Sequence, residues 1–248
     1  MEHKVIEHQV ELQTKDGKVD GFLYSNDTGI PQPGIIFYTD IRGIRQANRD
    51  MASRLAAEGY MVLMPNVFFR TARPPVMDPN ADGNDFRRRF GELTAPLTPA
   101  VLDGDAKAYV GFLTKQVQVI DAPMGVVGYC FTGAFALRTA AALPDTIAAA
   151  ASFHGGGLYT DQPSSPHLVL PDVKARLYFG HANEDGSMPA DSISKFESSL
   201  RAWGGEFQSE VYEHARHGWT VPDSQAYARA EAEKAYGRLT SLLIDALK

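Results

Sequence analysis

The only cysteine of the 248-residue chain, Cys130, stands where a reactive side chain is expected. It lies at a turn between an apolar stretch that ends near Gly128 and an Ala-rich stretch that starts at Gly133. A nucleophile held on a tight strand-to-helix turn is exposed above its sheet, and flanking glycines let strand and helix approach. The start of a helix also favours the thiolate form of a cysteine. We therefore predict that Cys130 is the attacking atom of an acyl-transfer enzyme. The alternative is a small apolar core residue, the commonest role of a free cysteine.

Two polar clusters, residues 180–186 and 213–219, each follow a predicted strand later in the chain. In open α/β sheets the active site gathers at the carboxyl ends of the strands. An imidazole beside Cys130 would take the thiol proton and later return it to the leaving group. A carboxylate behind the imidazole would fix its tautomer and stabilise its cationic form. The chain order is then nucleophile, acid and histidine, which is the order that α/β-hydrolases use.

Each cluster offers two candidates. We choose His217 as the base because it lies in a loop and precedes a glycine, whereas His214 lies nearer the strand. We choose Asp185 as the acid over Glu184 because Asp185 lies in a turn that opens the next helix. A helix-start residue that stabilises free N–H groups is the alternative role for Asp185.

The elements that must position these side chains alternate between strand and helix. Continuous apolar runs predict buried parallel strands at residues 34–38 and 60–64, and further strands are predicted at residues 122–128, 146–153, 175–180 and 206–212. Helices are predicted around residues 51–58, 103–116, 188–203 and 223–247. Alternating patterns at residues 7–13 and 18–25 predict an N-terminal β-hairpin at the sheet edge. The whole pattern predicts one α/β domain over residues 1–248, with a mostly parallel, doubly wound sheet.

The segment of residues 68–99 is the least regular part of the chain, with five prolines and the run Arg87-Arg88-Arg89. Long irregular segments in compact domains are usually functional or mobile. We expect a short helix over residues 87–93 and a solvated helix face for at least two of the arginines. Arg87 is the candidate for facing the site and attracting an anionic substrate.

Composition excludes several other classes of protein. The net charge of −6 leaves no basic stripe for nucleic acid. One cysteine excludes an internal disulfide and a Cys-rich metal site, and the scattered histidines form no metal motif. No stretch reaches about 18 apolar residues, and the first residues lack the apolar run of a signal peptide. We expect a cytoplasmic monomer or homodimer with no metal, no cofactor and no membrane partner.

Residues 154–157, the run His-Gly-Gly-Gly after a predicted strand, are placed to border the site.

Several motifs in matching order resemble the dienelactone hydrolase family, the carboxymethylenebutenolidases and their relatives. They are Gly128-Tyr129-Cys130, the segment from Gly180 through Asp185 to Met188-Pro189, His217-Gly218-Trp219-Thr220, and the runs at residues 38–44 and 59–65. The resemblance covers the chain from about Gly34 to the end. It implies an α/β-hydrolase fold and a triad of Cys130, His217 and Asp185.

The same resemblance implies further site residues. The backbone N–H groups of Phe131 and Ile41 would form the oxyanion hole. Asp40 stands where an acidic residue, usually glutamate, interacts with the resting thiol. Trp219, Phe131 and Tyr38 would give a fairly apolar pocket.

Two positions depart from the family pattern. Thr132 replaces a usual glycine, with Gly133 following, and Val221 replaces the arginine that holds a substrate carboxylate in dienelactone hydrolases. Valine cannot make that bidentate contact. We therefore expect a hydrolase of small esters or lactones that works through an acyl-cysteine and is not specific for dienelactone.

Two other classes remain open. One is a small-molecule-binding protein on a hydrolase fold that has lost turnover. The other is an enzyme like the glutamine amidotransferases, which also place a cysteine on a strand-to-helix turn. That class needs a glutamate shortly after its histidine, and no glutamate lies two residues after His217.

Overall fold

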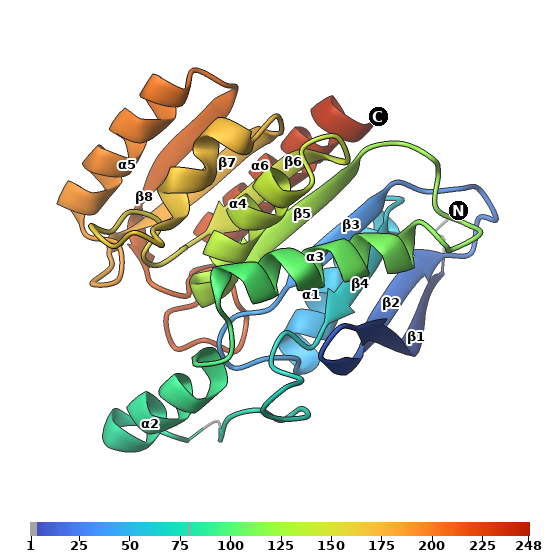
Figure 1. The fold of residues 1–248 in the computed structure, drawn as a ribbon, viewed down its shortest axis with the longest axis horizontal. Coiled ribbons are helices and arrows are strands. Elements are labelled where there is room, and N and C mark those ends of the chain that lie inside the picture. The colour runs from blue at the N-terminus through green and yellow to red at the C-terminus, as the bar shows by residue number, and fades with distance from the viewer. Residues whose placement is uncertain (1–3, 79) are drawn as a thin grey trace. The chain divides into compact units, whose positions relative to one another are not determined.

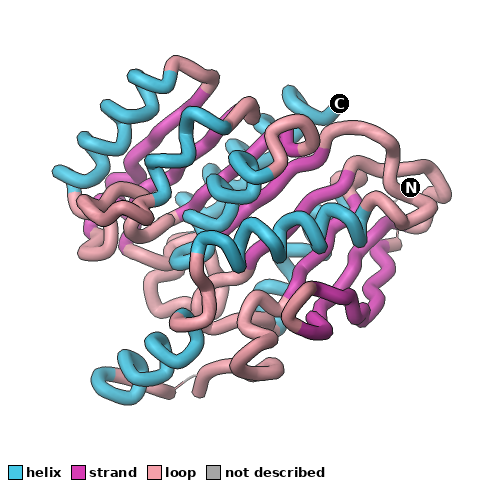
Figure 2. Tube along the Cα trace, viewed as in Figure 1, coloured by secondary structure: helices cyan, strands magenta, loops and turns pink. Residues whose placement is uncertain are grey.

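The computed structural model describes residues 4–78 and 80–248. The chain divides into two compact units. The first unit ends at Asp121, and the second unit runs from Ala122 to Lys248. Strands and helices alternate along the second unit, whereas the first unit begins with three consecutive strands and ends with two consecutive helices (Figures 1 and 2). No helix among the described residues is long and apolar enough to span a bilayer.

The strands of the first unit follow the order β1-β2-β4-β3. They are β1 (Val5–Thr14), β2 (Gly17–Asn26), β3 (Gly34–Tyr38) and β4 (Met61–Pro65). β1 and β2 form the predicted N-terminal hairpin, in which Thr14 pairs with Gly17 and β1 takes the edge. β4 pairs antiparallel with β2 and parallel with β3. Every residue of β3 and β4 is buried, as their unbroken apolar runs predicted.

The helices of the first unit are α1 (Gln46–Ala57), α2 (Gly83–Thr94) and α3 (Pro99–Leu113). In Figure 1, α3 lies in front of the strands of this unit and α1 lies behind them. α3 begins earlier than predicted because the Thr98 side chain accepts a hydrogen bond from the N–H of Val101 and Pro99 suits the first helical turn. α2 is longer than predicted and buries only Leu93.

The second unit holds four parallel strands in the order β5-β6-β7-β8. They are β5 (Met124–Tyr129), β6 (Ile147–Phe153), β7 (Arg176–Glu184) and β8 (Phe207–Arg216), and the helices are α4 (Gly133–Ala142), α5 (Ala190–Trp203) and α6 (Arg229–Leu247). α4 lies in front of the strands in Figure 1 and α6 lies behind them. With helices on both faces of each unit's strands and mostly parallel pairing, the predicted doubly wound arrangement is confirmed.

The register of the second unit decides where its polar side chains meet. Tyr129 at the end of β5 pairs with Phe153 at the end of β6, and Glu184 at the end of β7 pairs with Arg216 at the end of β8. The residues that follow these four strand ends therefore share one edge of the sheet.

β7 and β8 run several residues past their predicted ends, and α6 begins at Arg229 rather than near residue 223. Turns fill the stretch between β8 and α6, where the N–H of Ala228 bonds to the carbonyl of Trp219. This stretch therefore forms a loop that starts where β8 ends and folds back on itself.

Candidate active site

Cys130 lies on a strained turn at the end of β5. It opens a 3₁₀ turn, η1 (Cys130–Thr132), which leads directly into α4. Its φ of 57° is left-handed, a conformation that non-glycine residues adopt at a cost of about 1–3 kcal/mol, mostly at functional sites. A Cβ on Gly128 would collide with the carbonyl oxygen of Thr132, and one on Gly133 would collide with Ser152 Oγ. The two glycines are thus required by the close approach of strand and helix.

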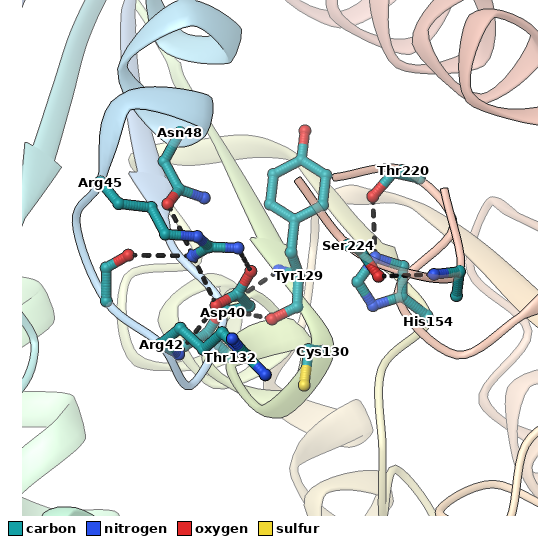
Figure 3. A network of polar contacts seen from close by, with 12 residues as sticks. Asp40, Arg42, Arg45, Asn48, Tyr129, Cys130, Thr132, His154, Thr220 and Ser224 are labelled. Atoms are coloured by element: carbon teal, nitrogen blue, oxygen red, sulfur yellow. Dashed lines mark hydrogen bonds and ion pairs between the residues drawn. The ribbon is translucent and has the colours of Figure 1, made fainter. Parts of the chain in front are cut away.

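Thr132 closes this turn with its side chain (Figure 3). Its Oγ1 accepts a hydrogen bond of 3.1 Å from the N–H of Tyr129 and donates one of 3.0 Å to the Tyr129 carbonyl. The side chain is fully buried. The departure from the family glycine at this position therefore leaves the turn intact, because the crowded positions are 128 and 133.

Three distant side chains form one hydrogen-bonded line at the sheet edge. Nε2 of His217 lies 3.0 Å from Sγ of Cys130, and Nδ1 of His217 lies 2.6 Å from Oδ2 of Asp185. The Asp185 side chain is 3% exposed and that of His217 is 33% exposed. Cys130 is half-buried. The line therefore runs from a buried carboxylate to a half-buried cysteine.

Ser187 holds the other oxygen of the Asp185 carboxylate. Its N–H and its hydroxyl both donate to Oδ1, over 2.8 and 2.6 Å, and its Oγ lies 3.3 Å from Nδ1 of His217. Burial by itself raises the pKa of Asp185, but the hydrogen bonds from His217 and Ser187 outweigh it and hold the pKa below its usual value. The carboxylate is therefore ionised at neutral pH.

The surroundings of His217 favour its cationic form. Burial lowers the pKa of His217, but the hydrogen bonds to Asp185 and Cys130 outweigh burial and raise the pKa to about 10. A histidine in this state can hold a thiolate beside it and donate a proton to a leaving group.

The competing candidates lie elsewhere. His214 is exposed on β8, and Glu184 is exposed at the end of β7. The structure brings together the three side chains that the sequence selects, Cys130, Asp185 and His217. Their catalytic roles stay a prediction.

The aromatic candidates of the second unit differ in exposure. Phe131 is half-buried, and its ring packs on Phe135 with centroids 5.0 Å apart. Trp219 is fully buried. Its ring packs edge-on against His154, with centroids 5.1 Å apart, and in a tilted arrangement on Tyr212, with centroids 4.8 Å apart. Val221 is buried as well. Contact of Phe131 or Trp219 with a substrate stays a prediction.

In the first unit, the Asp40 carboxylate is held by Arg45. Oδ1 accepts from Nη1 of Arg45 at 2.8 Å and from the N–H of Arg42 at 2.8 Å, and Oδ2 pairs with Nη2 of Arg45 at 2.7 Å (Figure 3). Nη1 of Arg45 also donates to Asn48. The Asp40 carboxylate thus fixes the turn that contains Ile41. A contact of Asp40 with the thiol stays a prediction.

The other candidates of the first unit are distributed between core and surface. Tyr38 is buried and packs on Tyr109. Ile41 is also buried. Arg87 is exposed on α2, where it donates to Asn84, while Arg88 and Arg89 pair with Glu92 on the helix surface. The roles of Tyr38, Ile41 and Arg87 toward a substrate stay predictions.

Sequence reasoning missed Ser187 and Thr220. Neither residue stands out by type, and the contacts of both depend on turns that only the folded chain defines. Among residues 4–78 and 80–248, no group of three or more His, Cys, Asp or Glu side chains is placed to hold a metal ion.

Comparison with known proteins defines the class. The fold superposes on that of a Klebsiella pneumoniae protein provisionally named a dienelactone hydrolase, with a TM-score of 0.87 and a sequence identity of 22%. The superposition covers 97% of this chain and 99% of that one. It also matches a dienelactone hydrolase of Anabaena variabilis, with a TM-score of 0.67 and 20% identity over 99% of this chain and 100% of that one. The fold is therefore that of the α/β-hydrolases, as predicted.

The sequence gives the family. The model of the dienelactone hydrolase family matches residues 19–247. A carboxymethylenebutenolidase of Pseudomonas putida is 26% identical over 234 residues, which cover 94% of each chain. The chain is a hydrolase that belongs to the dienelactone hydrolase family, and the resemblance noted in the sequence is confirmed.

Proposed function

We propose that this protein hydrolyses small carboxylic esters or lactones through an acyl-cysteine intermediate. One observation carries the proposal: His217 lies within hydrogen-bonding distance of Cys130 on one side, 3.0 Å, and of Asp185 on the other, 2.6 Å. A nucleophile, a base and an orienting acid in this sequence are the arrangement that acyl transfer requires.

The proposed reaction has two halves. The Cys130 sulfur attacks the carbonyl carbon, and the tetrahedral oxyanion accepts a hydrogen bond from the N–H of Phe131. The carbon–oxygen bond to the leaving group then breaks, and the cationic His217 gives its proton to the departing alkoxide oxygen. In the second half a water molecule attacks the acyl-cysteine and loses a proton to His217. The carbon–sulfur bond breaks, the acid leaves and the thiolate returns.

Asp185 and the turn at Ile41 have supporting roles in this proposal. The ionised carboxylate of Asp185 keeps the proton on Nδ1 of His217, so that Nε2 faces the sulfur. By resemblance to the family, the N–H of Ile41 is the second oxyanion donor. The bidentate pair of Asp40 with Arg45 holds the backbone turn on which Ile41 lies.

The substrate class follows from Val221. Relatives of this chain carry the name carboxymethylenebutenolidase. The position at which the family holds a substrate carboxylate is here a buried valine, which offers no hydrogen bond. We infer that the substrate is an ester or lactone without a carboxylate at that point.

Kinetics on a panel of aryl esters, lactones and thioesters tests the proposal. Cys130→Ala, His217→Gln and Asp185→Asn should each lower kcat about 10³-fold or more on the best substrate. His214→Gln and Glu184→Gln, which alter the exposed competitors, should keep wild-type kcat. A Cys130→Ala protein with full activity would exclude the mechanism. Tight binding without turnover by the wild type would favour a binding protein, and ammonia release from glutamine would favour an amidotransferase.

A further inference from the structure

His154 is a buried histidine for which the proposed reaction has no role. It directly follows β6, is 1% exposed and has a φ of 42°. A left-handed histidine in the core is costly, and such strain persists only where the surroundings impose it. Burial, reinforced by the nearby positive charge of His217, holds the pKa of His154 well below its usual value. The imidazole is therefore neutral.

The turn that His154 opens is bonded to all three segments that carry the proposed triad. The N–H of Gly156 points at the carbonyl of Cys130 over 3.4 Å, and the N–H of Gly157 donates to the carbonyl of Ser187 over 2.9 Å. Nε2 of His154 lies 2.7 Å from Oγ1 of Thr220, in the loop of the triad histidine (Figure 3). Residues 154–157 thus connect the elbow, the acid turn and the histidine loop.

The ring of His154 also contacts the triad histidine itself. The centroids of the His154 and His217 rings lie 5.2 Å apart, and the ring planes meet at 66°. This edge-on contact limits how far the His217 ring can tilt away from the line between Cys130 and Asp185. Because His154 is neutral, it fills this place without repelling an imidazolium.

We propose that His154 is a positioning residue that holds the imidazole of His217 between Cys130 and Asp185, through its hydrogen bond to Thr220 and its edge-on ring contact. The inference rests on the proposed function of the triad. It assigns a task to the His-Gly-Gly-Gly run, whose glycines leave space for neighbouring side chains. A Cβ on Gly156, for example, would lie 2.8 Å from Ser187 Oγ.

Four variants separate positioning from mere stability. His154→Phe keeps a ring but loses the hydrogen bond, His154→Gln keeps a polar group at similar reach, and Thr220→Val removes only the hydroxyl. The matched control is Thr14→Val. Thr14 is 6% exposed against 7% for Thr220, and its hydroxyl donates to the carbonyl of Gly17 in the hairpin of the first unit.

Alkylation by iodoacetamide reports on one residue, because the chain has a single cysteine. We expect His154→Phe and Thr220→Val to move the midpoint of the alkylation rate profile about 1 pH unit upward, a tenfold weaker pairing of thiolate with imidazolium. On the best ester, kcat should fall about 10- to 100-fold while KM stays near the wild-type value, as for a misplaced catalytic group. His154→Gln should retain more activity than His154→Phe.

The control Thr14→Val should lower the melting temperature and leave the alkylation profile and kcat unchanged. His154→Phe and Thr220→Val proteins that lose only thermal stability, as the control does, would overturn the inference. The variant His217→Gln tests whether the alkylation rate depends on His217. If the rate depends on His217 but not on His154 or Thr220, the inference about His154 fails while the proposed triad stands. If alkylation does not depend on His217, the proposed triad fails and the inference falls with it.

Discussion

The hydroxyl of Ser187 donates to Oδ1 of Asp185 over 2.6 Å, while the other oxygen of that carboxylate lies 2.6 Å from Nδ1 of His217. The carboxylate is therefore held from both ends, and its plane is set before any substrate binds. A carboxylate that could rotate would orient the imidazole less well, because the direction of the Nδ1 hydrogen bond fixes the ring.

Ser187→Ala should lower kcat about tenfold with little change in KM, since it removes a hydrogen bond to a charged group, worth about 1.4 kcal/mol or more. Steady-state kinetics on an aryl ester measures both constants. Ser198→Ala is the control, because the Ser198 hydroxyl donates to the carbonyl of Ser194 and accepts from Arg201, both on its own helix α5. Equal kcat in wild type and Ser187→Ala would show that the orientation of the Asp185 carboxylate does not depend on the hydrogen bond from the Ser187 hydroxyl.

Cys130→Gly should be more stable than Cys130→Ala by about 1 kcal/mol or more, because glycine adopts a left-handed conformation without a Cβ clash. Both variants should be inactive. Chemical denaturation of the two proteins, with the wild type alongside, gives the difference. An alanine variant as stable as the glycine variant would mean that the φ of 57° at residue 130 carries no strain.

Arg45→Gln should lower the free energy of unfolding by about 3 kcal/mol or more, because it leaves the buried Asp40 carboxylate without its bidentate partner. The side chains of Asp40 and Arg45 are 9% and 22% exposed. Arg49→Gln is the matched control. Its ion pair with Glu7 is roughly one-third exposed, so its loss should cost about 1 kcal/mol or less. Denaturant unfolding that finds equal costs would contradict the anchoring role given to Asp40.

His181→Leu should reduce the decrease in the free energy of unfolding that the wild type shows as the pH falls. Burial lowers the pKa of His181 to about 4, a shift that the charges of Glu197 and Asp185 only partly oppose, whereas the unfolded chain takes up this proton near pH 6.5. The unfolded state therefore binds more protons between these values, and wild-type stability should fall by up to about 3 kcal/mol from pH 6.5 to 4.

Thermal unfolding of both proteins across this pH range measures the slope, and only the wild type should show this contribution. His214→Leu, at an exposed histidine, is the control and should keep the wild-type slope. A His181→Leu protein that loses stability in acid as steeply as the wild type would show that other groups carry the effect.

Much of the fold could be predicted because buried parallel strands are recognisable in the sequence as continuous apolar runs. β3, β4 and β5 lie within a residue or two of their predicted bounds. The carboxyl ends of the longer strands β7 and β8 could not be predicted in this way, since most of their last residues are polar and lie next to the candidate site. Their length depends on pairing such as Glu184 with Arg216, which no local pattern encodes.

The candidate site divides in a similar manner. Cys130, Asp185 and His217 could be found because each has a reactive residue type and directly follows a strand end. The partners that hold them, Ser187 and Thr220, could not be found, since hydroxyl residues are common in loops. Thr220 meets His154 across 66 residues of chain, a contact that only the folded sheet edge creates.

The left-handed backbone at residue 130 also limits which nucleophiles this scaffold can accept in evolution or design. Cysteine and serine both carry a single atom beyond Cβ, so sulfur can be exchanged for oxygen without rebuilding the turn. Threonine is branched at Cβ, and such residues are genuine outliers at positive φ. A lineage that starts from this chain therefore has access to serine hydrolases, whereas a threonine enzyme would need a different elbow.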